Sequence, residues 1–347
     1  MRKTYRNIIL FFPLLFVFVF AFNFQAKAQQ LPIYSQYWMN KFLLNPAIAG
    51  HEGYTAVNLT VREQWVGLPD APETYAITGQ TRLLKNSYIS RNASIRKRNR
   101  AMSRSGRVGY GGYIFSDNNG IFNKTGMQGT YAYHLTLRRS QLSFGLSGIL
   151  YQYKINKDNI KTFDDYASDL KLINAKDKSI IFDANFGSYY SDRNLYAGFS
   201  VLNLFESFIN LTPSTPDYKL ERNYLFMAGY RYDIIDFLFV EPAALLKASE
   251  KAVVQLDLGI NTYIKEDYWV GIAYRTGSGN RISHVSLEGR GSSINFFGGA
   301  RVDKYYFGYC FDYTLSSIGS KTLGSHEITI AAKFGDSARR YRWLNRY

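Results

Sequence analysis

Residues 141–150 read Gln-Leu-Ser-Phe-Gly-Leu-Ser-Gly-Ile-Leu, and apolar residues alternate with small or polar ones along most of this stretch. Successive side chains of a β-strand point to opposite faces, so the pattern gives a strand one apolar and one polar face. The apolar face carries Leu142, Phe144, Leu146 and Leu150, and the other carries Gln141, Ser143, Gly145 and Ser147. The same period of two recurs in 193–203, 251–264 and 327–334, which predicts an all-β chain.

Fourteen such segments can be counted, and several are long enough to cross a bilayer as tilted strands, which takes about 9–11 residues. A soluble β-sandwich would show the same alternation, so strand length is the feature that favours a membrane protein. The predicted strands lie near 54–63, 73–83, 107–116, 124–137, 140–153, 178–190, 193–204, 221–232, 236–248, 251–263, 267–276, 292–302, 304–314 and 325–334. We predict a transmembrane antiparallel β-barrel of about 14 strands.

The connections between these segments mostly alternate between tight and long. Outer-membrane barrels have short periplasmic turns, longer outer loops and an even strand number, which here predicts both ends of the chain in the periplasm. One long connection, 84–106, falls on the periplasmic side by strand parity and breaks the pattern. Closure would leave no unpaired strand edge in lipid.

The composition fits a barrel of this kind. The 347 residues include 29 Tyr, 25 Phe and 28 Gly but only 8 Pro, and aromatic residues gather at both membrane interfaces of such barrels. The single cysteine, Cys310, excludes an intrachain disulfide. After residue 28 there is no uncharged apolar window long enough for a membrane-spanning helix.

Residues 1–28 have the pattern of a secretory signal peptide. Three basic residues precede the uncharged stretch 8–22, and Ala26-Lys27-Ala28 places small residues before a cut at Gln29. An uncleaved N-terminal anchor is the alternative. Either way the chain is expected to be exported, and with the barrel prediction this indicates the outer membrane of a Gram-negative cell.

Several short motifs surround the predicted first and last strands. They are Tyr34-Ser35-Gln36-Tyr37 with Asn40, Asn45-Pro46-Ala47 with Gly50, Arg62 with Gln64-Trp65, then Asp312 and His326-Glu327. Together they resemble the PorP/SprF family of type IX secretion system outer-membrane proteins over nearly all of the mature chain. Ile48 and Cys310 depart from the residues that are common in the family at those places.

The resemblance implies a non-enzymatic barrel that assists type IX secretion. Members work with particular large secreted proteins, including gliding adhesins, and help them reach or stay on the cell surface. Other members act with the core machinery through its periplasmic components. A porin-like transporter, or one like the FadL fatty-acid transporter, of small or hydrophobic molecules is the alternative function.

Residues 29–52 are predicted to form a compact, turning segment ahead of the barrel, which spans 53–334. The residue before a proline is disfavoured in a helix, so Asn45-Pro46 favours a turn. Gly50 permits a left-handed backbone. This segment could fill the barrel as a plug, or lie against its periplasmic rim as a tail.

Charged residues within strands are expected to point inward, because a charge on the lipid face costs about 2–4 kcal/mol at the midplane. Arg62 shares a face with Asn58 and Thr60, and Asp257 is inward on the same grounds. Together with Gln64, Trp65, Asp312, His326 and Glu327, they are candidates for lining the lumen. Their role is either contact with a plug or cargo segment, or structural ion pairing.

No arrangement of residues indicates catalysis. The four histidines are scattered without a metal-ligand spacing, so no metal or cofactor is predicted. His326 beside Glu327 is expected at the rim, and Asp117-Asn118-Asn119-Gly120 is more simply a turn than a calcium site. A barrel-type surface enzyme is a third hypothesis.

Two segments are strongly basic in a chain whose formal net charge is +15. One includes Arg96, Lys97, Arg98 and Arg100, and the tail 335–347 includes Arg339, Arg340 and Arg342. Export argues against nucleic acid, so acidic protein partners or lipid headgroups are the expected contacts, with a merely solvated loop as the alternative. A monomeric barrel within a larger complex is expected.

Reversing Arg96, Lys97, Arg98 and Arg100 to Glu should leave the barrel in the outer membrane but reduce the recovery of secretion components with it. Positive charge speeds encounters with acidic partners and makes them salt-dependent. Affinity purification from native membranes measures the effect. Undiminished partner recovery together with normal display of surface proteins would identify this segment as a bystander loop.

Overall fold

The computed structural model describes residues 32–83, 107–120, 122–137, 140–155, 178–209, 218–249, 254–265, 267–276 and 292–334. The predicted signal peptide, the basic segment 84–106 and the tail 335–347 lie outside these residues. So do Arg96, Lys97, Arg98, Arg100, Arg339, Arg340 and Arg342.

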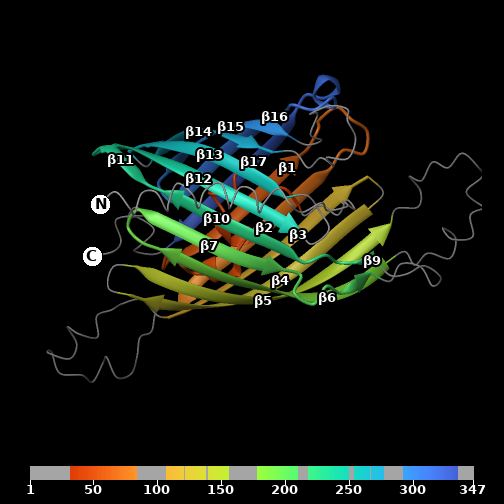
Figure 1. Ribbon diagram of the computed structural model, residues 1–347, viewed down its shortest axis with the longest axis horizontal. Coiled ribbons are helices and arrows are strands. Elements are labelled where there is room, and N and C mark those ends of the chain that lie inside the picture. Colours follow the sequence, from red (N-terminus) through yellow and green to blue (C-terminus); the bar gives the residue numbers. More distant parts are fainter. Residues whose placement is uncertain are drawn as a thin grey trace, which may run out of the picture.

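The described strands form a closed antiparallel barrel of 14 strands, as the alternation predicted (Figure 1). Each predicted segment overlaps one of them. Their bounds are β1 Thr55–Glu63, β2 Glu73–Leu83, β3 Val108–Asn119, β4 Phe122–Thr136, β5 Gln141–Ile155, β6 Lys178–Ser191, β7 Leu195–Leu202, β10 Asn223–Tyr230 continued by β11 Tyr232–Ile235, β12 Leu238–Ser249, β13 Gln255–Ile264, β14 Tyr268–Arg275, β15 Ser293–Val302, β16 Tyr305–Thr314 and β17 Ser325–Phe334.

The first and last strands close the barrel. β1 pairs with β17 along its whole length, from Thr55 beside Phe334 to Glu63 beside His326. Closure leaves the barrel without an edge strand, which a sheet in lipid requires because no water is present to satisfy open backbone groups. Arg62 and Glu327 are direct neighbours across this seam.

One strand of the barrel is interrupted at Arg231. Gly229 pairs with Ala243 in β12, and Tyr232 pairs with Val240 in the same register. In this register Tyr230 faces Pro242 and Arg231 faces Glu241, and Pro242 has no backbone N–H to donate across to β10. The Arg231 N–H donates instead to the Asn194 carbonyl at 2.7 Å, in the turn between β6 and β7.

The two ends of the barrel differ. We call the left end in Figure 1, which carries the turns 192–194, 236–237 and 303–304, the tight-turn end. The connections 64–72 and 315–324 emerge at the opposite, long-connection end, where β8 (Phe208–Ile209) and β9 (Tyr218–Lys219) add a small two-stranded sheet that the sequence did not predict. β1 begins and β17 ends at the tight-turn end.

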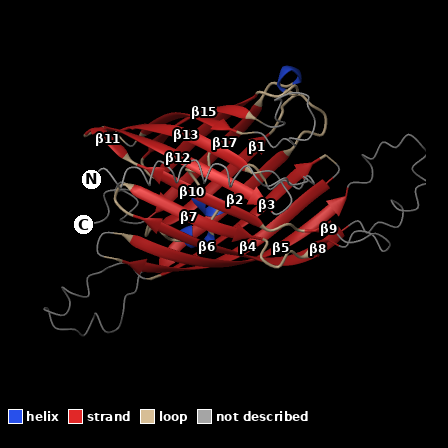
Figure 2. Cartoon of the chain, viewed as in Figure 1, coloured by secondary structure: helices blue, strands red, loops and turns tan. Residues whose placement is uncertain are grey.

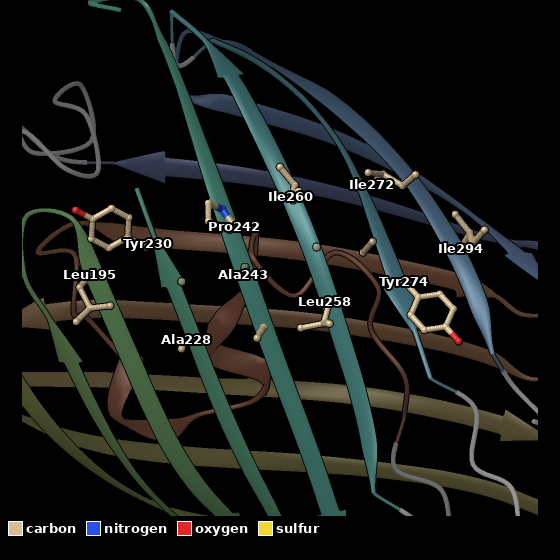
Figure 3. A pocket seen from close by; sticks show the side chains of 14 residues that line it. Leu195, Ala228, Tyr230, Pro242, Ala243, Leu258, Ile260, Ile272, Tyr274 and Ile294 are labelled. Atoms are coloured by element: carbon tan, nitrogen blue, oxygen red, sulfur yellow. The ribbon is translucent and has the colours of Figure 1, made fainter. Parts of the chain in front are cut away.

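The outer wall is apolar and carries a shallow hollow of about 690 Å³ (Figure 3). It is lined by small residues such as Ala228, Pro242 and Ala244 and by larger side chains such as Leu258 and Tyr274. The outer face of the barrel, which meets lipid, is therefore hollowed where small residues lie next to one another on neighbouring strands.

The described part of the chain before β1, residues 32–54, lies inside the barrel and is called the luminal segment below. It contains two short 3₁₀ helices, η1 (Lys41–Leu43) and η2 (Pro46–Ile48), which Figure 2 shows within the ring of strands. Ala47 and Ala49 are fully buried, and Tyr37, Trp38 and Phe42 join the main apolar cluster. The segment fills the lumen instead of lying against the rim.

Among the described residues, no helix has the length and apolarity needed to span a membrane.

Glycines in the barrel wall make room for this segment. A Cβ atom at Gly187 would lie 2.1 Å from the Asn45 side-chain oxygen, and one at Gly145 would lie 2.3 Å from the Pro46 carbonyl carbon. A Cβ at Gly109 would be 2.0 Å from the Ala49 carbonyl oxygen. Real atoms do not approach so closely, so the wall must lack side chains here for the segment to dock.

Gly187→Ala should therefore weaken the docking of the luminal segment, while Gly129→Ala should not. Overpacking a filled site typically costs about 1–3 kcal/mol, whereas a Cβ at Gly129 meets nothing within 4 Å. Urea unfolding of the detergent-folded barrel measures the difference. Equal midpoints for the two variants would contradict tight docking against β6.

Candidate functional site

The candidate site is a charged network inside the lumen, centred on Arg62. Arg62 is the penultimate residue of β1 and only 3% exposed, because alternation turns it inward. Its Nη2 atom lies 2.6 Å from Asp312 Oδ2 on β16, and its Nη1 atom lies 3.2 Å from Glu327 Oε2 on β17. One arginine thus joins the three strands on both sides of the closing seam.

Glu327 also binds the backbone of the luminal segment. Its two carboxylate oxygens accept hydrogen bonds from the N–H groups of Ser35, at 2.7 Å, and Gln36, at 2.8 Å. The Gln36 side-chain amide donates to the Glu327 carbonyl at 3.0 Å. Hydrogen bonds that involve an ionised group are about twice as strong as neutral ones, so this pair of contacts fixes the position of the segment.

Ser35 links a second arginine to the first. Its hydroxyl donates to Asp312 Oδ2 at 2.6 Å and accepts from Arg62 Nη1 at 2.8 Å and from Arg275 Nη1 at 3.1 Å. Arg275, the last residue of β14, contacts both carboxylate oxygens of Asp257 through Nε at 3.1 Å. The motif residue Ser35 is therefore a shared partner of charges from β1, β14 and β16.

The buried charges are close to balanced. Three carboxylates, Asp257, Asp312 and Glu327, face Arg62 and Arg275, and Lys247 on β12 adds an attractive charge near Asp257. A buried ion is costly unless it is paired and hydrogen-bonded. Because the luminal segment supplies part of that hydrogen bonding, it completes the network.

Asn45 holds the middle of the luminal segment. Its side-chain amide donates to the Ser188 carbonyl at 2.9 Å and to the Phe199 carbonyl at 3.2 Å, while its side-chain oxygen accepts from the Ala47 N–H at 2.9 Å. The backbone of Asn45 is extended, as expected before Pro46, and η2 begins directly after it. The Asn-Pro-Ala motif thus forms a capped turn docked on β6 and β7.

A histidine cluster holds the segment at the tight-turn end. His51 Nε2 lies 2.8 Å from Ser191 Oγ, and His134 Nε2 lies 3.0 Å from the Ala49 carbonyl oxygen. Ser143 Oγ lies between the two rings, 3.2 Å from His51 Nδ1 and 2.8 Å from His134 Nδ1. Gly50 follows Ala49 with a φ of +67°, so the left-handed turn expected of it is present.

Sequence reasoning missed Arg275, which donates to Ser35, and it also missed a contact of Lys41 in the luminal segment. Lys41 Nζ lies 3.7 Å from Glu241 Oε1 on β12 and 3.1 Å from the centre of the Tyr196 ring on β7. The Tyr196 hydroxyl donates to the same carboxylate at 3.0 Å. The available signal was Glu241, an acid among apolar residues in the first half of β12, to which the argument used for Asp257 also applies.

The other predicted site residues are distributed as follows. Tyr34 and Tyr37 are buried in the lumen, and Asn40 donates to Thr78 Oγ1 of β2 at 3.1 Å. Gln64 and Trp65 lie in the connection after β1, where the Trp65 N–H donates to Ser325 Oγ at 3.1 Å. They border the network at the long-connection end.

His326, which was expected at the rim and also grouped with the lumen candidates, is the second residue of β17 and does not line the lumen. Its neighbour Glu327 points inward, and strand alternation therefore turns His326 outward. There its Nδ1 atom lies 2.7 Å from the Tyr309 hydroxyl, close to the ring of Phe311. Among the described residues, no group of three or more His, Cys, Asp or Glu side chains could hold a metal ion.

Comparison with known proteins agrees with the motifs. The model of the family described as "Type IX secretion system membrane protein PorP/SprF" matches residues 26–332. The chain belongs to the PorP/SprF family. The matched region of this PorP/SprF protein covers the luminal segment and all but the end of β17. No curated protein matches its sequence significantly.

Solved outer-membrane proteins resemble this PorP/SprF protein only distantly. Omp33 of Acinetobacter baumannii is 8% identical, with 81% of this chain and 97% of that chain covered and a TM-score of 0.40. The toluene transporter TbuX of Ralstonia pickettii is 8% identical, with 84% and 91% covered and a TM-score of 0.42. BamA of Haemophilus ducreyi lacking POTRA domains 1–3 is 8% identical, with 81% and 70% covered and a TM-score of 0.41.

Arg62→Leu should destabilise the barrel far more than Val61→Leu. Removing one partner of a buried ion pair typically costs about 3–5 kcal/mol because the remaining charge is left unpaired; here Glu327 loses its arginine, and Asp312 keeps only Arg275, at 3.5 Å. Val61→Leu keeps an apolar residue on the outer face. Urea unfolding followed by heat-dependent gel migration compares the variants, and similar stability would show that Arg62 is not the centre of the network.

Proposed function

We propose that this protein is a non-enzymatic outer-membrane barrel that assists type IX secretion and the surface attachment of specific cargo proteins, such as adhesins. It does so by binding cargo, periplasmic secretion components, or both. Membership of the PorP/SprF family supports the association with the secretion system. The barrel fold and the family together support an outer-membrane location.

The filled lumen is the observation that carries this proposal. Buried contacts hold the luminal segment along its length, from Ser35 through Asn45 to His51. A pore for solutes needs a continuous water-filled path, whereas this segment packs the interior with apolar side chains such as Trp38 and Phe42. A barrel that is filled in this way is suited to presenting its two ends to partners.

The orientation follows from the lengths of the connections. Outer-membrane barrels have short turns in the periplasm and longer loops outside. The tight-turn end then meets periplasmic secretion components, and the long-connection end meets the surface protein. Cleavage of residues 1–28 during export belongs to the same proposal.

The alternative of a transporter for small or hydrophobic molecules makes a different prediction. A transporter would have to move the luminal segment and release contacts at the charged network, at Asn45 and at the histidine cluster. These contacts are buried or part-buried, so a steadily open state would lose many hydrogen bonds at once.

Purification from native outer membranes should recover secretion components and a surface protein together with the barrel. Val61→Leu serves as the matched control, because it changes only the outer face, and should give the same recovery. Recovery of the barrel alone from wild-type membranes would contradict the partner-binding role.

Reconstitution into planar bilayers separates the two functions. Wild-type protein should show no steady conductance, because the luminal segment fills the barrel. Asn45→Ala, which loses the two contacts with β6 and β7, should conduct intermittently. A steady, open conductance of the wild-type barrel would favour the transporter.

A further inference from the structure

The luminal segment does not enter and leave the barrel at the same end. Its Ser35 and Gln36 bind Glu327, the third residue of β17, and Ser35 also binds Asp312, near the end of β16. Both positions lie at the long-connection end, where β16 ends and β17 begins. The start of the described chain is therefore held near that end.

The other end of the segment lies at the tight-turn end. His51 contacts Ser191, the last residue of β6, and Ser143, the third residue of β5. The chain then enters β1 at Thr55, which pairs with Phe334. From Thr55 to Arg62, seven residues of strand at about 3.3 Å each span roughly 23 Å, and the luminal segment crosses a similar depth in the opposite direction.

The contacts between these ends follow the same course. Asn40 bonds to Thr78 in the middle of β2, and Asn45 then bonds to the backbone of Ser188 and Phe199. Residues 35, 40, 45 and 51 thus meet the wall at successively different depths. The segment is a single crossing of the lumen, and not a loop that returns to the end where it entered.

We infer that the mature protein is threaded through its own barrel and presents its N-terminal end at the long-connection mouth, within reach of the cell surface. Pro32 and Ile33 are half-buried there, ahead of the buried Tyr34. The expectation that both chain ends lie in the periplasm then stays a prediction for the ends of the barrel, at Thr55 and Phe334, and does not extend to the start of the mature chain. The link to the cell surface rests on the orientation given under the proposed function.

This arrangement gives a surface partner direct access to the segment that fills the barrel. A protein bound at the long-connection mouth would contact the start of the luminal segment, whose next residues, Ser35 and Gln36, bind the charged network. The luminal segment ends beside Ser191 and Ser143 at the periplasmic mouth. One continuous piece of backbone therefore joins the two surfaces at which partners are proposed to bind.

Thiol labelling of intact cells tests the threading. The native protein is the blank, because its only cysteine, Cys310, is fully buried. Pro32→Cys is the test variant, Leu323→Cys marks the long-connection end with a 72% exposed position, and Lys304→Cys marks a tight turn. A polyethylene glycol maleimide too large to pass through porins is added before and after the outer membrane is permeabilised.

Pro32→Cys and Leu323→Cys should be labelled on intact cells, and Lys304→Cys only after permeabilisation. Labelling of Pro32→Cys in the pattern of Lys304→Cys overturns the threading. So does a Pro32→Cys thiol that reacts only after the protein is unfolded, since the inference requires it to be reachable.

The controls separate this inference from the proposed function. If Lys304→Cys were labelled on intact cells and Leu323→Cys were not, the proposed orientation would be reversed, and the claim of surface access would fall with it. The threading itself would still be judged by whether Pro32→Cys follows Leu323→Cys.

Discussion

The need to pair charge inside a filled barrel governs this structure. Arg62 and Arg275 point into the lumen because the opposite face of each strand meets lipid, where a charge is costly. Once inward, they require carboxylates, and Asp257, Asp312 and Glu327 supply them from other strands. The remaining hydrogen-bonding capacity of Glu327 is met by the backbone of Ser35 and Gln36. The luminal segment thus occupies the lumen and also supplies hydrogen bonds to the buried charges of the barrel.

The strands could be predicted from sequence because each one is determined locally. In Gln141–Ile155 the alternation of apolar and small residues selects an extended chain with one lipid face, whatever the rest of the molecule does. The same logic turned Arg62 and Asp257 inward. Pro242 shows the limit of such local prediction. The interruption at Arg231 depends on the pairing of β10 and β11 with β12, and the sequence of one strand alone does not reveal that pairing.

The partners within the lumen could not be predicted in this way. Arg62 and Asp312 are 250 positions apart, and their contact exists only because β1, β17 and β16 are neighbours in the closed barrel. His326 was grouped with the lumen candidates because its motif neighbour Glu327 was treated together with it, although adjacent residues of a strand face opposite sides. The contact of Lys41 was not predicted, because Lys41 lies between the two quoted motifs and its partners Glu241 and Tyr196 lie on strands far along the chain. The Asn45-Pro46 turn was the exception, since its geometry is local.

The position of Arg62 beside Glu327 on the closing seam has a consequence for assembly. β1 and β17 are the first and last strands of the barrel along the chain, and their pairing closes the ring. The luminal segment precedes β1, and Glu327 binds it from the strand that arrives last. A ring that closed around an empty interior would leave that carboxylate without its backbone donors until the segment entered through one of the two mouths. The last strand of the chain thus holds the segment that precedes the first strand, and the seam that closes the ring is also the place where its filling is anchored.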